Sequence, residues 1–72
     1  MIDVQTRREA ERFRLALNTL GLFPSITRYT NGGYRIDCDL GSRDEMALEA
    51  YLHDGHRADR VTWEKVDAYR QN

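Results

Sequence analysis

The residue types best suited to nucleophilic or metal chemistry are one cysteine and two histidines. Cys38 is the single thiol of the chain, and His53 and His56 are separated by Asp54 and Gly55. A structural zinc site needs four nitrogen or sulfur ligands at a recognisable spacing, which these three residues do not supply. Gly55 is expected to end a helix, so the two imidazoles need not share a helix face. We therefore predict no metal site, and we expect Cys38 to be buried and unreactive.

Clustered carboxylates could instead indicate calcium binding or acid–base catalysis. They are Asp37, Asp39, Asp44 and Glu45. The EF-hand spacing fails, because Gly41 and Leu48 occupy positions where that loop requires ligands. The sequence also contains no phosphate-binding glycine loop, nucleophile elbow or dinucleotide fingerprint. We predict that the chain is not an enzyme and needs no cofactor.

Aromatic and basic residues gather around an expected hairpin turn. They are Arg28, Tyr29, Asn31, Tyr34 and Arg35. Two arginines and two tyrosines beside a polar turn can bind phosphate and stack on nucleic-acid bases. The net charge of −1 argues against this interpretation, because small nucleic-acid-binding domains usually carry a basic excess. Nucleic-acid binding through this tip is therefore the alternative hypothesis.

Two apolar residues are expected to lie on the solvent side of their helices. Leu15 falls between Arg8 and Arg12, opposite the buried stripe of the first helix, and Met46 falls beside Glu49 on a later helix. Protein interfaces favour arginine and apolar anchors. We predict that these five residues contact another protein.

The helix that carries Leu15 is marked at both ends. Thr6 and Glu9 form a capping-box pattern at its start, although Asp3 offers an earlier one. Gly21 and Pro24 mark its end. Between these signals, apolar residues recur at helical spacing: Ala10, Phe13, Ala16, Leu17 and Leu20.

Residues 25–40 are expected to form a β-hairpin whose second strand alternates between apolar and polar residues. The turn can occupy residues 31–32, which pairs Tyr29 with Tyr34, or begin one residue later, which pairs Arg28 with Asp37. Tyr29 shares the inner face with Ile36 in both registers. Cys38 also falls on that inner face.

A second helix is expected over residues 42–54, with a further capping-box pattern at Ser42 and Glu45 and a stop at Gly55. A short third helix is expected to begin after Thr62. Its inward residues would be Trp63, Val66 and Tyr69. The alternative is a third strand over residues 60–66, because Val61 and Trp63 also alternate.

These elements predict a small α+β fold in the order αββαα, with αββαβ as the alternative. The length of 72 residues suits a single domain, 1–72. One cysteine cannot form an intramolecular disulfide, which favours a reducing, cytoplasmic location. No apolar run approaches the length of a membrane helix and no signal peptide is evident, so no membrane association is expected.

Charge is distributed unevenly along the chain. Residues 1–35 carry a net +3 and residues 36–72 a net −4. Opposed halves can pair with a partner or head to tail with a second copy. A small domain with an open sheet edge also gains stability from assembly, so we predict a weak, reversible homodimer centred on Leu15.

In its size, its lack of catalytic groups and its opposed charge, the chain resembles in type the small phage-borne inhibitors of bacterial defence, anti-CRISPR proteins among them. The resemblance implies a non-catalytic module, encoded by a phage or mobile element, that inhibits or regulates a host complex by binding one of its proteins.

Overall fold

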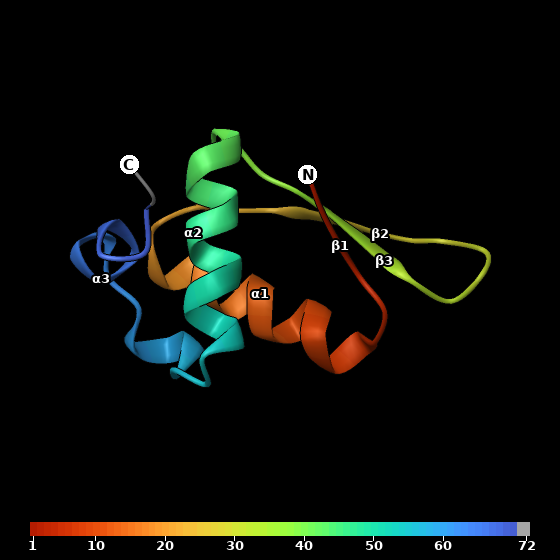
Figure 1. Ribbon diagram of the computed structural model, residues 1–72. Coiled ribbons are helices and arrows are strands. Elements are labelled where there is room, and N and C mark those ends of the chain that lie inside the picture. The colour runs from red at the N-terminus through yellow and green to blue at the C-terminus, as the bar shows by residue number, and fades with distance from the viewer. Residues whose placement is uncertain (71–72) are drawn as a thin grey trace.

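The computed structural model describes residues 1–70 and contains three helices and a three-stranded sheet (Figure 1). The elements follow one another as β1 (Ile2–Val4), α1 (Arg7–Thr19), β2 (Ser25–Arg28), β3 (Tyr34–Asp37), α2 (Ser42–His53), the one-turn helix η1 (Ala58–Arg60) and α3 (Trp63–Asp67). The strands are antiparallel and lie in the order β1-β3-β2. The predicted α+β class is confirmed.

The third strand of the sheet is the N-terminal segment, not residues 60–66. Ile2 pairs with Ile36 of β3, and Ile2 and Val4 are both buried, whereas Asp3 between them is exposed. Three residues form too short a pattern to be distinguished from a helix lead-in. Residues 60–66 instead enter a helix, because the Thr62 hydroxyl accepts the Lys65 amide hydrogen at 3.2 Å.

The hairpin adopts neither of the registers considered from the sequence. Tyr29 donates its amide hydrogen to the Gly33 carbonyl at 2.8 Å, and Arg28 pairs with Tyr34. The loop between them has three residues, and Gly32 takes the left-handed backbone conformation at φ +99°. Such a loop combines a type I turn with a bulge and shifts the register by one residue. Tyr29 consequently lies on the outer face of the sheet, opposite to the face that carries Ile36.

The two faces of the sheet have different surroundings. The inner face contributes Ile2, Val4 and Ile36 to the core and is covered by α1, which packs on β1 and β3. The outer face carries polar residues, and no element of residues 1–70 covers it (Figure 1). Alternate strand residues point to opposite faces of a sheet. The residues on the outer face are therefore Asp3, Ser25, Thr27, Tyr29, Arg35 and Asp37.

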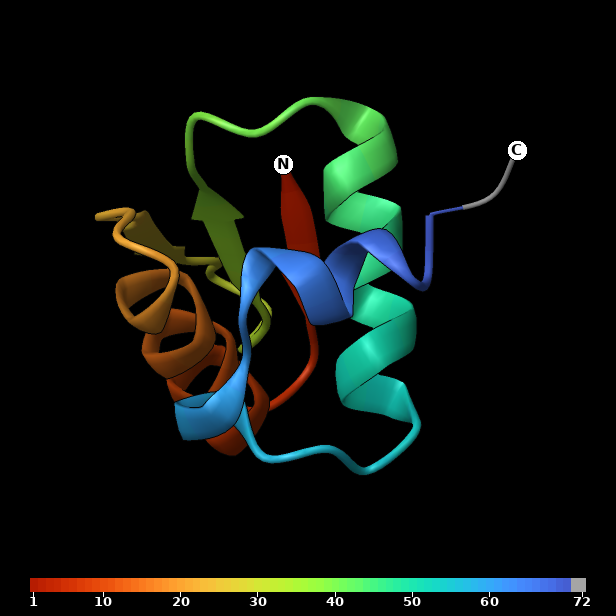
Figure 2. The ribbon, with the colours of Figure 1, turned by 90° about the vertical axis from the view of Figure 1, so that its left-hand side faces the viewer.

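Helices α2 and α3 pack on each other, and β1 lies between α1 and α2 (Figure 2). The core comprises Ile2, Val4, Ala10, Ala16, Leu17, Leu20, Ile36, Ala47, Leu48, Tyr51, Leu52, Ala58, Val61 and Val66. Trp63 was expected to pack inward but is 39% exposed. Val66 is fully buried and Tyr69 packs at the edge of the core, as predicted.

Helix α1 begins and ends as predicted. The Thr6 hydroxyl accepts the Glu9 amide hydrogen, and the Glu9 carboxylate accepts the Thr6 amide hydrogen. At the other end, Gly21 has φ +89°, and Leu22 donates its amide hydrogen to Leu17 at 2.8 Å. This is a Schellman motif, which satisfies carbonyls of the last turn.

The second capping-box prediction is wrong. Gly41, not Ser42, is the N-cap residue of α2, and no side chain caps the helix. The Glu45 carboxylate turns instead toward the ammonium group of Met1 and forms an ion pair with it. The end of this helix is as predicted, with Gly55 at φ +88°.

Candidate functional site

Three of the residues predicted to bind a protein lie together on the solvent side of α1. Arg8, Arg12 and Leu15 line a shallow groove of about 410 Å³, together with Glu11, Arg14 and Asn18. Leu15 is 48% exposed. We call the surface formed by Arg8, Arg12 and Leu15 the α1 face.

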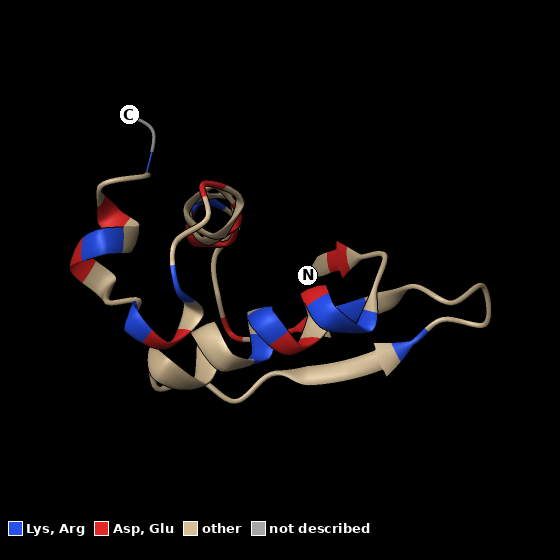
Figure 3. Ribbon diagram, turned by 90° about the horizontal axis from the view of Figure 1, so that it is seen from below, with Lys and Arg blue, Asp and Glu red and all other residues tan. Residues whose placement is uncertain are grey.

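The arginines around Leu15 have different partners. The Arg12 guanidinium donates to the His56 carbonyl at 2.7 Å, which fixes its orientation. Arg14 is paired with Glu11 one turn earlier. Among residues 1–70, Arg8 has no carboxylate within ion-pair distance. Basic and acidic residues alternate along α1 (Figure 3), so this helix of the basic sequence half carries charges of both signs.

The other two predicted residues lie on α2, away from the α1 face. Met46 is 68% exposed. Glu49 lines a second groove of about 400 Å³, and Arg12 is the residue that both grooves share. Four of the five predicted residues therefore line two grooves that meet at Arg12, and Met46 lines neither.

The second groove runs between β1 and α2 and is closed at one end by the start of α1. Buried or half-buried apolar side chains form its floor, and polar side chains, all exposed except the half-buried Arg12, form its rim. We call it the β1–α2 groove. Its floor is Val4, Phe13 and Leu52, and its rim is Asp3, Glu9, Arg12, Glu49 and His53.

Glu49 is the carboxylate of this rim whose surroundings disfavour its charge. Partial burial raises its pKa, and the nearby Glu45 and Asp3 carboxylates raise it further. The Met1 ammonium group acts in the opposite direction, with an influence smaller than that of Glu45 but larger than that of Asp3. Beyond the effect of burial, the neighbouring carboxylates thus outweigh the ammonium group in their effect on the Glu49 charge.

The hairpin-tip residues proposed for nucleic-acid binding are divided between the two faces of the sheet. Arg28 and Tyr34 share the inner side, whereas Tyr29 and Arg35 lie on the outer side. Asn31 lies in the turn and accepts the Gly33 amide hydrogen at 3.2 Å. The structure thus does not bring the two tyrosines and two arginines into a single clamp.

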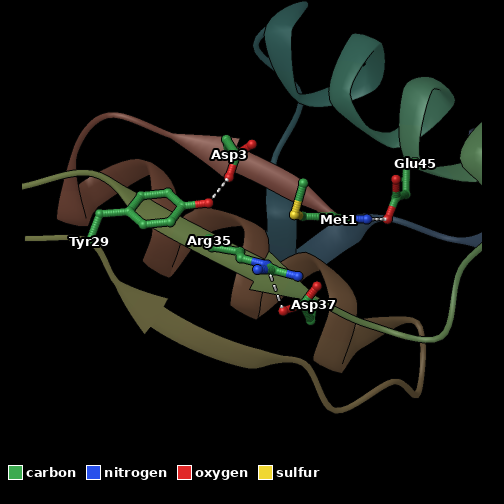
Figure 4. Close-up of polar contacts among 6 residues, drawn as sticks. All are labelled: Met1, Asp3, Tyr29, Arg35, Asp37 and Glu45. Atoms are coloured by element: carbon green, nitrogen blue, oxygen red, sulfur yellow. Dashed lines mark hydrogen bonds and ion pairs between the residues drawn. The ribbon is translucent and has the colours of Figure 1, made fainter.

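The outer pair at the tip already has protein partners (Figure 4). The Tyr29 hydroxyl donates to the Asp3 carboxylate at 2.7 Å, and this bond raises the Tyr29 pKa. Arg35 forms an ion pair with Asp37 at 3.1 Å. Both groups are tied to acidic neighbours that a phosphate would have to displace.

Cys38 lies just beyond β3 and is half-buried against the core. Burial is the largest cause of its raised pKa, and the neighbouring carboxylates add to it. The thiolate, which is the reactive form, is therefore disfavoured.

His56 belongs to an aromatic cluster that the sequence did not reveal. Its ring stacks on Tyr51 with centroids 4.5 Å apart, and its Nε2 lies 2.9 Å from the Tyr69 hydroxyl. Tyr69 in turn donates to Asp54 at 2.5 Å, which raises the Tyr69 pKa. These contacts join the end of α2 to the end of α3. Within residues 1–70, no three histidine, cysteine or carboxylate side chains are grouped so that they could hold a metal ion.

Phe23 is a further exposed residue that sequence reasoning missed. It is 88% exposed in the turn between α1 and β2. Its position between Gly21 and Pro24, outside any periodic element, was the available signal.

No protein-family model, curated protein or solved structure matches the chain. Within residues 1–70, no helix combines the length and apolar character needed to cross a bilayer. The basis for assigning a function is therefore the chemistry of the surfaces described above.

Proposed function

We propose that the chain is a non-catalytic module that binds another protein in the reducing cytosol. It would act as an inhibitor or accessory regulator of a host complex, in the manner of phage-encoded inhibitors. The α1 face is the observation that supports this proposal best. An apolar side chain exposed among arginines is typical of interface centres.

The α1 face is partly pre-organised for contact. Arg12 is held by the His56 carbonyl, so less side-chain entropy is lost when it meets a carboxylate. Arg8 retains its full donor capacity, since no carboxylate of residues 1–70 pairs with it. A partner that fits this surface presents an apolar pocket for Leu15 with acidic residues at its rim.

Affinity capture tests the proposal. The purified chain is used as bait in lysate from cells that naturally carry it, with nuclease added. We expect a protein that is captured by the wild-type chain and lost with Leu15→Asp. Trp63→Asp is the matched control, because it places the same charge at an exposed apolar residue of α3 that is not among the predicted contact residues. Capture that survives Leu15→Asp, or that nuclease abolishes, contradicts the proposal.

A second copy of the chain is the other protein that the α1 face can engage. Burying Leu15 contributes only about 1.5–3 kcal/mol per copy, so such a dimer would be weak. Sedimentation over a wide concentration range tests this part. We expect the apparent mass to rise with concentration and to stay at 8.4 kDa in Leu15→Asp. A constant mass in the wild-type chain contradicts self-association.

A further inference from the structure

The outer edge of β1 carries backbone groups that the sheet does not use. Tyr29 and Gly33 are hydrogen-bonded across the hairpin, so alternate residues of β3 from Gly33 onward point toward β2. The intervening residues of β3, which include Ile36, point toward β1. Ile2 and Val4 therefore bond to β3, whereas the amide and carbonyl of Asp3 point away from the sheet.

Those unpaired groups face the β1–α2 groove. Asp3 and Val4 line its β1 side, and Glu49, Ala50 and His53 line its α2 side. Met1 and Asp3 are two residues apart, so their backbone groups point to the same edge of the strand. The Met1 ammonium group reaches Glu45 of α2, which confirms that this edge faces α2. Figure 2 shows β1 next to α2 in the fold.

The groove has the shape and floor needed for an extended segment. The groove is open to solvent along one side, and its volume of about 400 Å³ lies within the range of specific binding sites. Val4 and Leu52, which are 7% and 2% exposed, give the floor an apolar surface. A strand added to a sheet edge gains affinity from main-chain hydrogen bonds and specificity from pockets for alternate side chains.

The rim of the groove selects positive charge. Three carboxylates stand there against one guanidinium, and Arg12 is directed to the His56 carbonyl. The Glu9 carboxylate is engaged in the α1 cap, and the Asp3 carboxylate accepts the Tyr29 hydroxyl. Glu49 has no cation within ion-pair distance among residues 1–70. A cationic side chain placed beside Glu49 would pair with a carboxylate that currently has no counter-ion.

We propose that the β1–α2 groove binds an extended segment of a partner protein that pairs with the Asp3 backbone as an additional strand. The segment carries an apolar residue over the floor next to an arginine or lysine beside Glu49, because neighbouring strand residues point to opposite sides. The proposal rests on the proposed protein-binding function but uses a different surface from the α1 face, so either can fail alone.

Peptide titration of the isotope-labelled chain tests the groove. The probe is acetyl-Val-Arg-Val-Arg-Val-amide, and the matched control probe replaces both arginines with glutamate. At about 5 mM probe, a site with a Kd in the millimolar range is occupied in a large fraction of the molecules, so its resonances shift measurably. We expect shifts at the Asp3 and Ala50 amides with the arginine probe, and none with the glutamate probe.

Variants separate the ion pair from the strand pairing. Glu49→Gln is expected to weaken binding of the arginine probe about two- to fivefold, as removal of one partly exposed ion pair should. Glu64→Gln, which removes an exposed carboxylate from α3, is the matched control and leaves binding unchanged. Two methylated probes, one at the central valine amide and one at both arginine amides, test the strand hydrogen bonds, because a paired strand directs only one of these two sets of amides toward Asp3. One of the two methylated probes is expected to lose the Asp3 shift.

Each other result overturns the proposal. No shift at Asp3 and Ala50, or equal shifts with both probes, excludes a basic segment in this groove. Unchanged binding of both methylated probes excludes strand pairing. Shifts confined to the α1 face place the contact elsewhere. A negative peptide result with Leu15-dependent capture leaves the proposed function intact, whereas a positive peptide result without that capture rejects the α1 face alone.

Discussion

Helices α1 and α2 begin with the same local pattern, a hydroxyl residue followed three positions later by glutamate. At α1, Thr6 and Glu9 cap the helix reciprocally, and both side chains are exposed. At α2, Ser42 takes no part in capping, and Glu45 is buried against Met1. The difference lies in what each glutamate meets beyond its own helix.

A local cap contributes only about 0.5–2 kcal/mol. An ammonium group brought beside Glu45 by strand pairing offers a stronger, charge-assisted bond. The Glu45 side chain is 12% exposed, so it has little access to competing water. The comparison shows that a capping sequence determines the cap only where no tertiary partner reaches the same carboxylate.

Replacing each of the two glutamates should reveal the largest difference in stability between the two helix starts. Glu45→Ala removes a charge-assisted bond from a buried carboxylate, whereas Met1 is half exposed and can be hydrated, so we expect a loss of about 1.5 kcal/mol in unfolding free energy. Glu9→Ala removes an exposed bond and should cost about 0.5 kcal/mol. Urea denaturation of both variants measures the difference. Equal losses would contradict the different roles assigned to the two carboxylates.

The hydroxyl residues give the next largest effect. Thr6→Ala should destabilise the chain by about 1 kcal/mol, because the Glu9 amide loses its acceptor. Ser42→Ala should leave stability unchanged or raise it slightly, since Ser42 caps nothing and alanine is the better helix former. Thermal unfolding distinguishes these results, and a loss at Ser42 comparable to that at Thr6 would reject the assignment of Gly41 as the cap.

Supplying the missing cap should make the two helix starts alike. Gly41 has φ −69°, and a Cβ atom there would meet nothing within 4 Å. Gly41→Ser is therefore expected to stabilise the chain by about 0.3 kcal/mol, the usual gain over a glycine cap. Gly32→Ser is the contrasting variant, because φ +99° strains any side chain, and it should destabilise. Chemical denaturation of both variants checks the opposite signs.

The elements that the sequence predicted correctly are those with local signals. The cap at Thr6, the stops at Gly21 and Gly55, and the cap at Thr62 each depend on contacts within a few residues. The strand Ile2–Val4, which the sequence did not predict, depends on pairing with distant residues. The hairpin register depends on one bulge. Such pairings leave too few alternating residues for the strand or its register to be recognised from the sequence.

The candidate surfaces were predictable to the same extent. Helical periodicity correctly placed Leu15 and Met46 in solvent, because each residue lies on a regular helix. It could not show that Glu49 belongs to a groove with β1, since that juxtaposition requires the unpredicted strand. The cluster of His56 and Tyr69 was hidden for a similar reason, because α3 brings its members together.

The smallest predicted effect is a change in the pKa of Glu49, which lies one helical turn after Glu45 on α2. The folded-state pKa of Glu49 lies above the usual 4.5, first because of burial and then because of the Glu45 charge. Protonated Glu49 is therefore favoured by folding. Its contribution to stability is complete below about pH 4.5 and is lost as the pH rises through the folded-state value.

Glu45→Gln removes the neighbouring charge and keeps the side-chain size. We expect the pKa of Glu49 to fall toward its usual value yet remain above it, because burial persists and is the larger cause. Carboxyl carbon shifts followed by NMR across acidic pH measure this change, with Glu64→Gln as the control that leaves it unaltered. An unchanged or higher Glu49 pKa in Glu45→Gln would show that the two carboxylates do not interact. The charge that we assign to the groove would then come from Glu49 and its rim neighbours alone.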